Sequence, residues 1–273
     1  MVALLVGGGS RLMDAMINKL NKYGHRVYLL TGKKESHFVY PRVFERYDFA
    51  YDSDSIKEIF ESIRPDVVIF LGAYDTNYRW EHARKESVQY SADLTNILSA
   101  YSVCKKGRFV YLSSQDVYGK SYMNDIVEEE ASSAKNFRSM AVAQGEDICQ
   151  TYERTQDMDI AVLRIDHFYA MPKKWEKQYN PCYQMVLEAF RNQKISANKR
   201  NRFSMIYLDD VVEYIYRVAE VEKLQHTVYN ISSNHVITQL ELAELIRKYM
   251  HEKIEVADAT VGEGFRLVLD GKR

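Results

Sequence analysis

The strongest indication of how this chain folds comes from residues 107 to 119, Gly-Arg-Phe-Val-Tyr-Leu-Ser-Ser-Gln-Asp-Val-Tyr-Gly. Residues 108 to 112 form a short apolar run of β-branched and aromatic side chains, with lysines and a glycine before it and small polar residues after it. Such a run predicts a strand that is buried on both faces of a parallel sheet. Its carboxyl end would present Ser113, Ser114 and Gln115 at the edge where open α/β sheets bind ligands.

The bulk properties of the chain are those of a folded globular protein. Its 273 residues are 46% apolar and 27% charged, and the formal net charge is −1 at pH 7. This length suits one large α/β domain, alone or with a smaller appendage. The balanced charge gives no general attraction to nucleic acids or acidic membranes, so we expect neither as a partner.

The sequence shows no targeting signal and no pattern typical of disulfides or metal ligands. Residues 1 to 6 run directly into an apolar strand without the basic start of a signal peptide, and no stretch approaches a membrane span. We therefore expect a cytoplasmic protein. The three cysteines, Cys104, Cys149 and Cys182, are odd in number and widely spaced, which predicts neither a disulfide framework nor a metal site.

Three motifs resemble those of the extended short-chain dehydrogenase/reductases, the family of nucleotide-sugar epimerases and dehydratases. Residues 113–119 are similar to the family's Ser-Ser/Thr-x-x-Val-Tyr-Gly signature, residues 66–73 to its Asp-Val-Val-Ile-His-Leu-Ala-Ala segment, and residues 203–212 to its Phe-x-x-Tyr-Val-x-Asp-Val segment. The resemblance implies a Rossmann-like doubly wound parallel sheet with helices on both faces and a small carboxyl-terminal substrate-binding region. It also implies a nucleotide-sugar-like ligand, a role for Ser114 in holding the sugar during hydride transfer, and a homodimer built on the helix expected over residues 80–104.

A glycine-rich turn, Gly7-Gly8-Gly9-Ser10, joins an expected strand to an expected helix. Dinucleotide-binding folds hold the cofactor's pyrophosphate at this place, on the amino end of the helix. The family pattern is Gly-x-x-Gly-x-x-Gly, but Ser10 and Met13 stand at its second and third glycines, and a Gly-x-Gly-x-x-Gly alignment puts Leu12 at the last glycine. Ser10 could cap the helix or bond a phosphate. The turn therefore predicts either a nucleotide site or a glycine-rich connection without a ligand.

The resemblance implies NAD or NADP as the cofactor. The second expected strand ends in Thr31-Gly32-Lys33-Lys34, where an acidic residue would bond the adenosine ribose of NAD. Two lysines and no carboxylate favour the 2′-phosphate of NADP, although lysines on a solvated loop would give the same sequence. Asp52 matches the family's aspartate near the adenine. The residues expected at the cofactor are Gly7, Gly9, Ser10, Arg11, Leu12, Thr31, Lys33, Asp52, Leu71, Gly72 and Ala73.

The family's catalytic pair is missing from its expected place. The pattern Tyr-x-x-Ser-Lys-x-x-Gly-Glu puts a tyrosine and a lysine one helical turn apart, where the ammonium lowers the pKa of the phenol. Here Gly145 and Glu146 align with the end of that pattern, which puts Arg138 at the tyrosine and Val142 at the lysine. Shifting the alignment by one residue does not supply an acid/base pair either.

We expect any surviving acid/base chemistry to use side chains near the end of the 108–112 strand. Asp116 is our first choice as the catalytic partner of Ser114, although an aspartate that only caps a turn would look the same. Gln115 stands where the family's dehydratases carry an acid and cannot supply a proton, which disfavours 4,6-dehydration. Further candidate substitutes are Tyr118, Tyr122 and His167, and the expected substrate-binding residues are Ser114, Gln115, Arg138, His167 and Arg202.

We expect two interleaved parts, a dinucleotide-binding domain over residues 1–165 and a mainly substrate-binding region over residues 166–273. Residues 172–202 are polar, aromatic and basic, which suits a nucleotide diphosphate but also a solvated loop and helix. Members of the family continue past the position that matches residue 273. The sequence is therefore expected to be a shortened member or a piece of a longer polypeptide.

The sequence leaves two functions open. The first is an NAD(P)-binding epimerase/dehydratase-like protein that acts on or binds a nucleotide sugar with a degraded catalytic site. The second is a non-catalytic Rossmann-fold module that binds a nucleotide or a partner protein as a sensor or scaffold. Arg138 bears on the choice, because a guanidinium can hold an anion but is a poor base near neutral pH.

Overall fold

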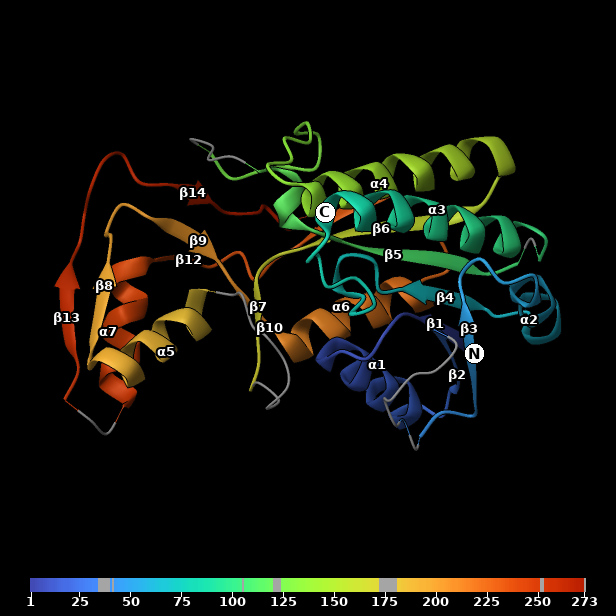
Figure 1. The fold of residues 1–273 in the computed structure, drawn as a ribbon, viewed down its shortest axis with the longest axis horizontal. Helices are drawn as coiled ribbons and strands as arrows, with labels where there is room; N and C mark the ends of the chain where they lie inside the picture. The colour runs from blue at the N-terminus through green and yellow to red at the C-terminus, as the bar shows by residue number, and fades with distance from the viewer. Residues whose placement is uncertain are drawn as a thin grey trace.

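A seven-stranded parallel sheet forms the centre of the molecule, in the order β11-β6-β5-β4-β1-β2-β3 (Figure 1). The computed structural model describes residues 1–33, 40, 42–104, 106–119, 124–171, 181–250 and 253–272. The strands are β1 (Val2–Val6), β2 (Arg26–Gly32), β3 (Glu45–Ala50), β4 (Val67–Phe70), β5 (Arg108–Ser114), β6 (Asp159–Ile165) and β11 (Val228–Ile231). Because the chain starts in the middle of the sheet and winds outward in both directions, the predicted doubly wound α/β fold is confirmed.

Side chains of the central strands alternate between two cores, as the period of a strand requires. In β1, Leu4 and Val6 belong to the core on one face, whereas Ala3 and Leu5 belong to the core on the other. All residues of β4 and β5 are buried. Burial on both faces explains why these stretches of sequence are apolar almost without interruption.

Helices cover both faces of the sheet (Figure 1). The helices α2 (Ser55–Ile63), α3 (Ala83–Ser102) and α4 (Phe137–Gln156) lie on one face, and α1 (Arg11–Lys22) and α6 (Leu208–Glu220) on the other. Ser10 caps α1, since its Oγ accepts a hydrogen bond from the N–H of Met13 at 3.1 Å. Within the described ranges, no helix combines the length and apolarity needed to cross a bilayer.

A smaller region lies at one end of the molecule, beyond the short strands β7 (Phe168–Tyr169) and β10 (Ile206–Tyr207) (Figure 1). Its elements are α5 (Pro181–Asn192), β8 (Lys194–Ala197), β9 (Arg202–Ser204), β12 (Val236–Thr238), α7 (Gln239–Tyr249), β13 (Glu255–Asp258) and β14 (Arg266–Leu267). They share a separate core that includes Met185, Phe203 and Ile246. Because β11 and α6 return to the main sheet, the two parts interleave, and the boundary at residue 165 stays a prediction.

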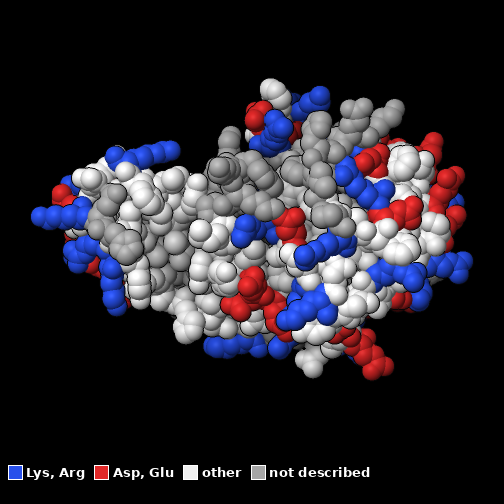
Figure 2. All heavy atoms as spheres, turned by 90° about the horizontal axis from the view of Figure 1, so that it is seen from below, with Lys and Arg blue, Asp and Glu red and all other residues white. Residues whose placement is uncertain are grey.

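Charge is mixed over the face of the molecule drawn in Figure 2. Acidic and basic side chains are interspersed over the main part of this face, while Lys and Arg predominate at the end formed by the smaller region. This distribution fits the net charge of −1. The expected absence of nucleic-acid partners remains a prediction.

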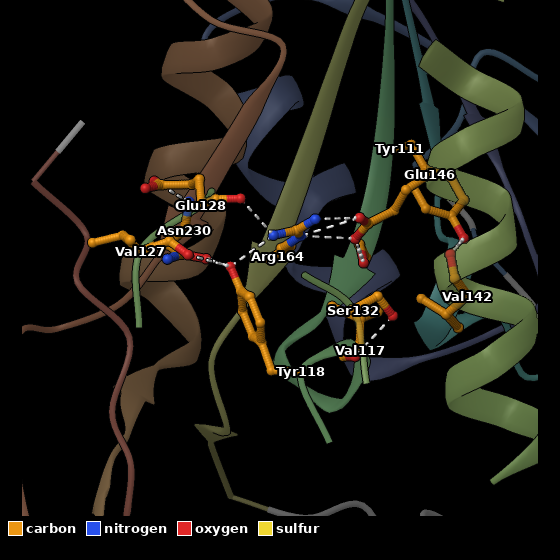
Figure 3. Close-up of polar contacts among 11 residues, drawn as sticks. Tyr111, Val117, Tyr118, Val127, Glu128, Ser132, Val142, Glu146, Arg164 and Asn230 are labelled. Carbon is orange, nitrogen blue, oxygen red and sulfur yellow. Dashed lines mark hydrogen bonds and ion pairs between the residues drawn. The ribbon is translucent and has the colours of Figure 1, made fainter. Parts of the chain in front are cut away.

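A buried ion pair joins β5, β6 and α4. Arg164 Nη2 lies 2.7 Å from Glu146 Oε2, and the two side chains are 8% and 3% exposed. Ser113 donates a hydrogen bond to Glu146 Oε1. Arg164 Nη1 donates to the Tyr118 hydroxyl at 2.8 Å and to the Glu128 carbonyl at 3.0 Å, and Figure 3 shows these groups converging on the guanidinium. The two buried charges are thus both paired and hydrogen-bonded, which is the condition for burying them.

We expect Arg164→Met to lower the free energy of unfolding by about 3–5 kcal/mol, because it leaves the Glu146 carboxylate buried without its counter-ion. Adding Glu146→Leu removes the stranded charge, so the double variant should be more stable than Arg164→Met alone. Urea unfolding followed by circular dichroism measures both. Arg217→Met, which removes an exposed ion pair with Glu213, is the control and should leave the stability nearly unchanged. An Arg164→Met variant as stable as this control would contradict the expectation.

Candidate functional site

The predicted site residues meet along the carboxyl edge of the sheet. The strands β1 and β4 are neighbours from which the chain winds in opposite directions, so their carboxyl ends form the topological switch point. The glycine turn follows β1, and the short 3-10 helix η1 (Gly72–Tyr74) follows β4. Ser114 ends β5, the 3-10 helix η2 (Gln115–Val117) comes after it, and His167 follows β6. One edge therefore collects the expected cofactor residues and most of the expected substrate residues.

Two glycines at this edge are required by the packing of the chain itself. Gly7 has a φ of 150°, and a Cβ built there would lie 2.7 Å from the side chain of Leu71. Gly72 has a φ of 52°, and a Cβ there would lie 2.2 Å from the Leu112 carbonyl oxygen. Glycine alone combines this backbone conformation with so close an approach. These contacts account for both glycines without reference to a cofactor.

A backbone donor of the glycine turn faces a carboxylate of the protein itself. The N–H of Gly8 donates to Asp75 Oδ1 at 2.7 Å, and the N–H of Asn77 donates to the same oxygen at 2.9 Å. The Tyr51 hydroxyl donates to Asp75 Oδ2 at 2.7 Å. Burial raises the pKa of Asp75, which is 3% exposed, and the hydrogen bonds act against that rise. A glycine turn ahead of a helix is suited to an anion, and here Asp75 supplies one.

Tyr51 and Asn77 also cover the end of β2. The Tyr51 ring packs directly on Gly32, where a Cβ would lie 2.2 Å from the ring. Asn77 Nδ2 donates to the Thr31 carbonyl at 2.7 Å, while the Thr31 hydroxyl turns to Asp48 Oδ1 at 2.8 Å. The other residues expected near the adenosine are Lys33 and Asp52, which are exposed, and Lys34, which lies outside the described residues.

The first turn of α1 is occupied by contacts within the protein. The Ser10 hydroxyl is used as the helix cap. A backbone hydrogen bond from Ser10 also reaches Tyr40 and partly offsets the burial that raises the pKa of this phenol to about 12. Arg11 is half-buried, whereas the side chain of Leu12 is fully buried in the core between α1 and the sheet. Of the two roles that the sequence left open for Ser10, the structure shows the cap.

Arg138, in the first turn of α4, bridges the ends of β4 and β5. Its Nη1 lies 2.6 Å from Asp116 Oδ2, and its Nη2 donates to the Ala73 carbonyl at 2.9 Å. Ser114 Oγ accepts from the N–H of Asp116 at 3.2 Å and also bonds the hydroxyl of Tyr74, whose pKa is raised by burial. The structure thus places Ser114 and Asp116 side by side, with the carboxylate of Asp116 engaged by Arg138.

Two buried tyrosines that were not among the candidate site residues lie under Val142. The side chain of Val142 is 1% exposed, and its carbonyl accepts from the Tyr111 hydroxyl at 2.9 Å. The hydroxyls of Tyr111 and Tyr90 are 2.6 Å apart, and burial raises the pKa of both phenols well above the ordinary value. Gly145 is required here, because a Cβ would lie 2.3 Å from the Tyr111 hydroxyl. Two neutral phenols therefore form the floor beneath the position expected to hold a lysine.

A polar cluster lies between β5 and β6. The carboxamide of Gln115 is satisfied when its nitrogen faces Asp166 Oδ1 at 2.8 Å and its oxygen faces His167 Nε2 at 2.8 Å. Asp166 Oδ2 accepts from the Ser232 hydroxyl at 2.9 Å. Burial raises the pKa of Asp166 to about 6 and lowers the pKa of His167. His167 is consequently neutral near pH 7 and acts as a hydrogen-bonding group.

The remaining candidates lie away from this cluster. Tyr118 is fully buried, with its hydroxyl bonded to Asn230 Oδ1 at 2.8 Å and to Arg164. Arg202 is exposed on β9, in the three-stranded sheet of the smaller region. Tyr122 and residues 172–180 lie outside the described residues. In the part of the chain that the structure describes, no group of three or more His, Cys, Asp or Glu side chains is arranged to hold a metal ion.

The family model of the NAD dependent epimerase/dehydratase family matches residues 3–232 of this chain. The chain belongs to this family. It is 26% identical to the dTDP-D-glucose 4,6-dehydratase of Dictyostelium discoideum over an alignment of 215 residues, and the match covers 71% of this chain and 47% of that protein. It is 28% identical to the dTDP-glucose 4,6-dehydratase of Streptomyces niveus over 153 residues, which are 56% of this chain and 45% of that protein. The chain thus spans about half the length of these curated relatives.

Solved structures of other enzymes share the fold of this epimerase/dehydratase family member. The UDP-glucose 4-epimerase of Thermotoga maritima, solved with UDP-glucose, has a TM-score of 0.81 at 17% identity and covers 100% of this chain and 90% of its own. The Bordetella bronchiseptica enzyme WbmG in complex with NAD and UDP has a TM-score of 0.79 at 14% identity. The match covers 98% of this chain and 84% of the WbmG chain. At such identities the likeness establishes the fold.

This family member departs from the NAD-dependent pattern at the cofactor edge. A pyrophosphate at the glycine turn would compete with Asp75 for the N–H of Gly8, and an adenosine at the end of β2 would compete with Tyr51 for the space over Gly32. The residues as they are arranged therefore do not fit a dinucleotide.

We expect the stability of the protein to fall between about pH 4 and about pH 6 through the ionisation of Asp166. Its pKa is raised from 3.8 to about 6 in the folded protein, so the folded state binds the proton more tightly than the unfolded state does. The resulting stability is fully present below pH 3.8 and is lost as the pH rises through about 6. Relative to Asp166→Asn, the free energy of unfolding of the wild type should fall by about 3 kcal/mol across this pH range. Guanidinium unfolding of both proteins over the pH series measures the difference, and a difference independent of pH would contradict the expectation.

Proposed function

We propose that this chain binds a nucleotide-sugar-like ligand at the edge around Ser114 and does not perform the hydride-transfer chemistry typical of its family. The observation that carries this proposal is the pair of residues at the catalytic positions. Arg138 stands in place of the phenol and is held by Asp116 and by the Ala73 carbonyl, while the buried Val142 stands in place of the lysine. A guanidinium is not deprotonated in proteins, so Arg138 cannot accept a proton from a sugar hydroxyl.

The groups that remain at this edge suit ligand binding. Ser114, Gln115 and His167 offer hydrogen-bonding atoms, and the Arg138 guanidinium, whose side chain is 30% exposed, complements a phosphate. Two neighbouring folds were solved with UDP-glucose and with NAD and UDP, and the curated relatives are named for dTDP-glucose. A nucleoside diphosphate sugar is the ligand class that these observations support.

Asp116 remains our first choice as an acid/base group. Its carboxylate would have to leave Arg138, 2.6 Å away, before it could exchange a proton with a substrate. The preference for NADP also remains a prediction, as do the homodimer and the cytoplasmic location. Lys33, on which that preference depends in part, is exposed at the end of β2.

We expect UDP-glucose or dTDP-glucose to bind the wild type in the absence of dinucleotide, and Arg138→Met to weaken that binding by about tenfold through the loss of one charge-assisted hydrogen bond. Asp116→Asn removes the carboxylate that competes for Arg138 and should strengthen binding. Isothermal titration calorimetry measures all three proteins, with the exposed Arg217→Met as the control. Failure of the wild type to bind any nucleoside diphosphate sugar at millimolar concentration would sink the proposal.

We expect no conversion of either sugar nucleotide by the wild type when NAD or NADP is added. The reason is that Arg138 cannot take the sugar proton and that the carboxylate of Asp116 is engaged by Arg138. Chromatographic analysis of the sugar nucleotide after prolonged incubation measures this. Accumulation of an epimerised, dehydrated or oxidised sugar that Asp116→Asn abolishes would overturn this half of the proposal and assign the acid/base role to Asp116.

A further inference from the structure

The segment Asp75–Asn77, just after η1, lies directly on the glycine turn. A Cβ built at Gly8 would lie 2.7 Å from Thr76 Oγ1 and 2.9 Å from Asn77 Oδ1. The Thr76 hydroxyl donates to the Gly9 carbonyl at 2.9 Å. Hydrogen bonds and direct contact therefore hold this segment on the turn, over the place where a dinucleotide-binding fold exposes its backbone to a phosphate.

Within this segment, Asp75 makes the contact that an anionic ligand would make. Three donors face its carboxylate, namely the N–H of Gly8 at 2.7 Å, the N–H of Asn77 at 2.9 Å and the Tyr51 hydroxyl at 2.7 Å. Three donors suit an ionised carboxylate, which only accepts hydrogen bonds. With 3% of its surface exposed, Asp75 is enclosed at the turn rather than presented to solvent.

Tyr51 extends the same closure to the end of β2. Its ring lies against Gly32, its hydroxyl holds Asp75, and it is itself 3% exposed. Asn77 Nδ2 lies 3.3 Å from the Tyr51 hydroxyl and 2.7 Å from the Thr31 carbonyl. Asp75, Tyr51 and Asn77 thus form one hydrogen-bonded unit, the turn closure, across the ends of β1, β2 and β4.

We infer that Asp75 is an intramolecular substitute for the pyrophosphate of a dinucleotide, so that NAD or NADP binds this chain only after Asp75 has left the glycine turn. This inference goes beyond the proposed function, because it concerns the dinucleotide edge and not the sugar ligand. It names Asp75 as the residue that controls cofactor affinity and Tyr51 as the residue that positions Asp75. The closure is an autoinhibitory contact built into the fold.

The physical basis is competition by a tethered group. Asp75 is joined to the turn through the fold, so it competes at a high effective concentration and does not dilute. A ligand that needs the open state has its affinity reduced by the fraction of molecules that are open. Removing the carboxylate should therefore increase dinucleotide affinity, whereas removal of a residue that ligates the dinucleotide would reduce it.

Calorimetric titration with NAD, NADH, NADP and NADPH tests the inference on the wild type, Asp75→Ser and Tyr51→Phe. Asp75→Ser removes the competing anion and should bind at least one of the four dinucleotides ten or more times tighter than the wild type. Tyr51→Phe keeps the ring but removes the hydroxyl that holds Asp75, and should give a smaller gain. If Asp75→Ser fails to fold, Tyr51→Phe decides the matter alone.

Asp93→Asn is the matched control. Asp93 is also a buried aspartate, 6% exposed, that accepts a hydrogen bond from a tyrosine hydroxyl, that of Tyr78 at 2.6 Å, and burial raises its pKa as well. Asp93 lies on α3, away from the glycine turn in sequence, and the Asp93→Asn substitution should leave dinucleotide affinity unchanged. Equal or weaker dinucleotide binding by Asp75→Ser and Tyr51→Phe than by the wild type overturns the inference. Because the sugar-nucleotide titrations contain no dinucleotide, failure here is distinguishable from failure of the proposed function.

Discussion

The contact between Arg164 and Glu146 fixes how α4 sits on the sheet, and the edge that carries Ser114 and Arg138 depends on that placement. Glu146 projects from α4, Arg164 from β6, and Ser113, which donates to Glu146, from β5. Arg138 lies about two turns earlier on the same helix, and Ser114 directly follows Ser113. The buried pair therefore sets the register that brings Arg138 to Asp116 and Ala73. The two buried charges are tolerated because each has polar partners. Arg164, Glu146 and Ser113 come from β6, α4 and β5, which pack together at this place.

Local signals in the sequence predicted the buried parallel strands, whereas the doubly wound arrangement was implied by the family resemblance, and the cap was one of two roles left open for Ser10. Continuous apolar runs mark the strands β4 and β5, and a hydroxyl residue ahead of an amphipathic stretch marks the start of α1. The sequence also showed Arg138 and Val142 at the positions of the family's tyrosine and lysine, because Gly145 and Glu146 anchor the alignment. The partners of Arg138 followed less directly, although Asp116 had been singled out for another role.

The turn closure could not be predicted, because its contacts join residues that are distant in sequence. Asp75 meets Gly8 across 67 positions and Tyr51 across 24. No periodicity or cap pattern carries such information. One signal was present, namely an acidic residue soon after the small residues that follow β4, but its meaning depends on how the loop folds back. Gly72 illustrates the same limit, since its close approach to the Leu112 carbonyl is visible only once β4 and β5 are paired.

The phenol floor beneath Val142 determines what a lysine at position 142 would require. A lysine at position 142 would place its ammonium in the cluster that contains Phe70, Tyr90 and Tyr111, where desolvation opposes the charge. Tyr111 cannot be made smaller without leaving a cavity, and Gly145 cannot be made larger because the Tyr111 hydroxyl occupies the space. Introducing a tyrosine at position 138 and a lysine at position 142 would thus also require changes to the phenol floor. The arrangement that we propose to be non-catalytic is therefore maintained by packing, and replacing Arg138 and Val142 alone would not restore the family's pair.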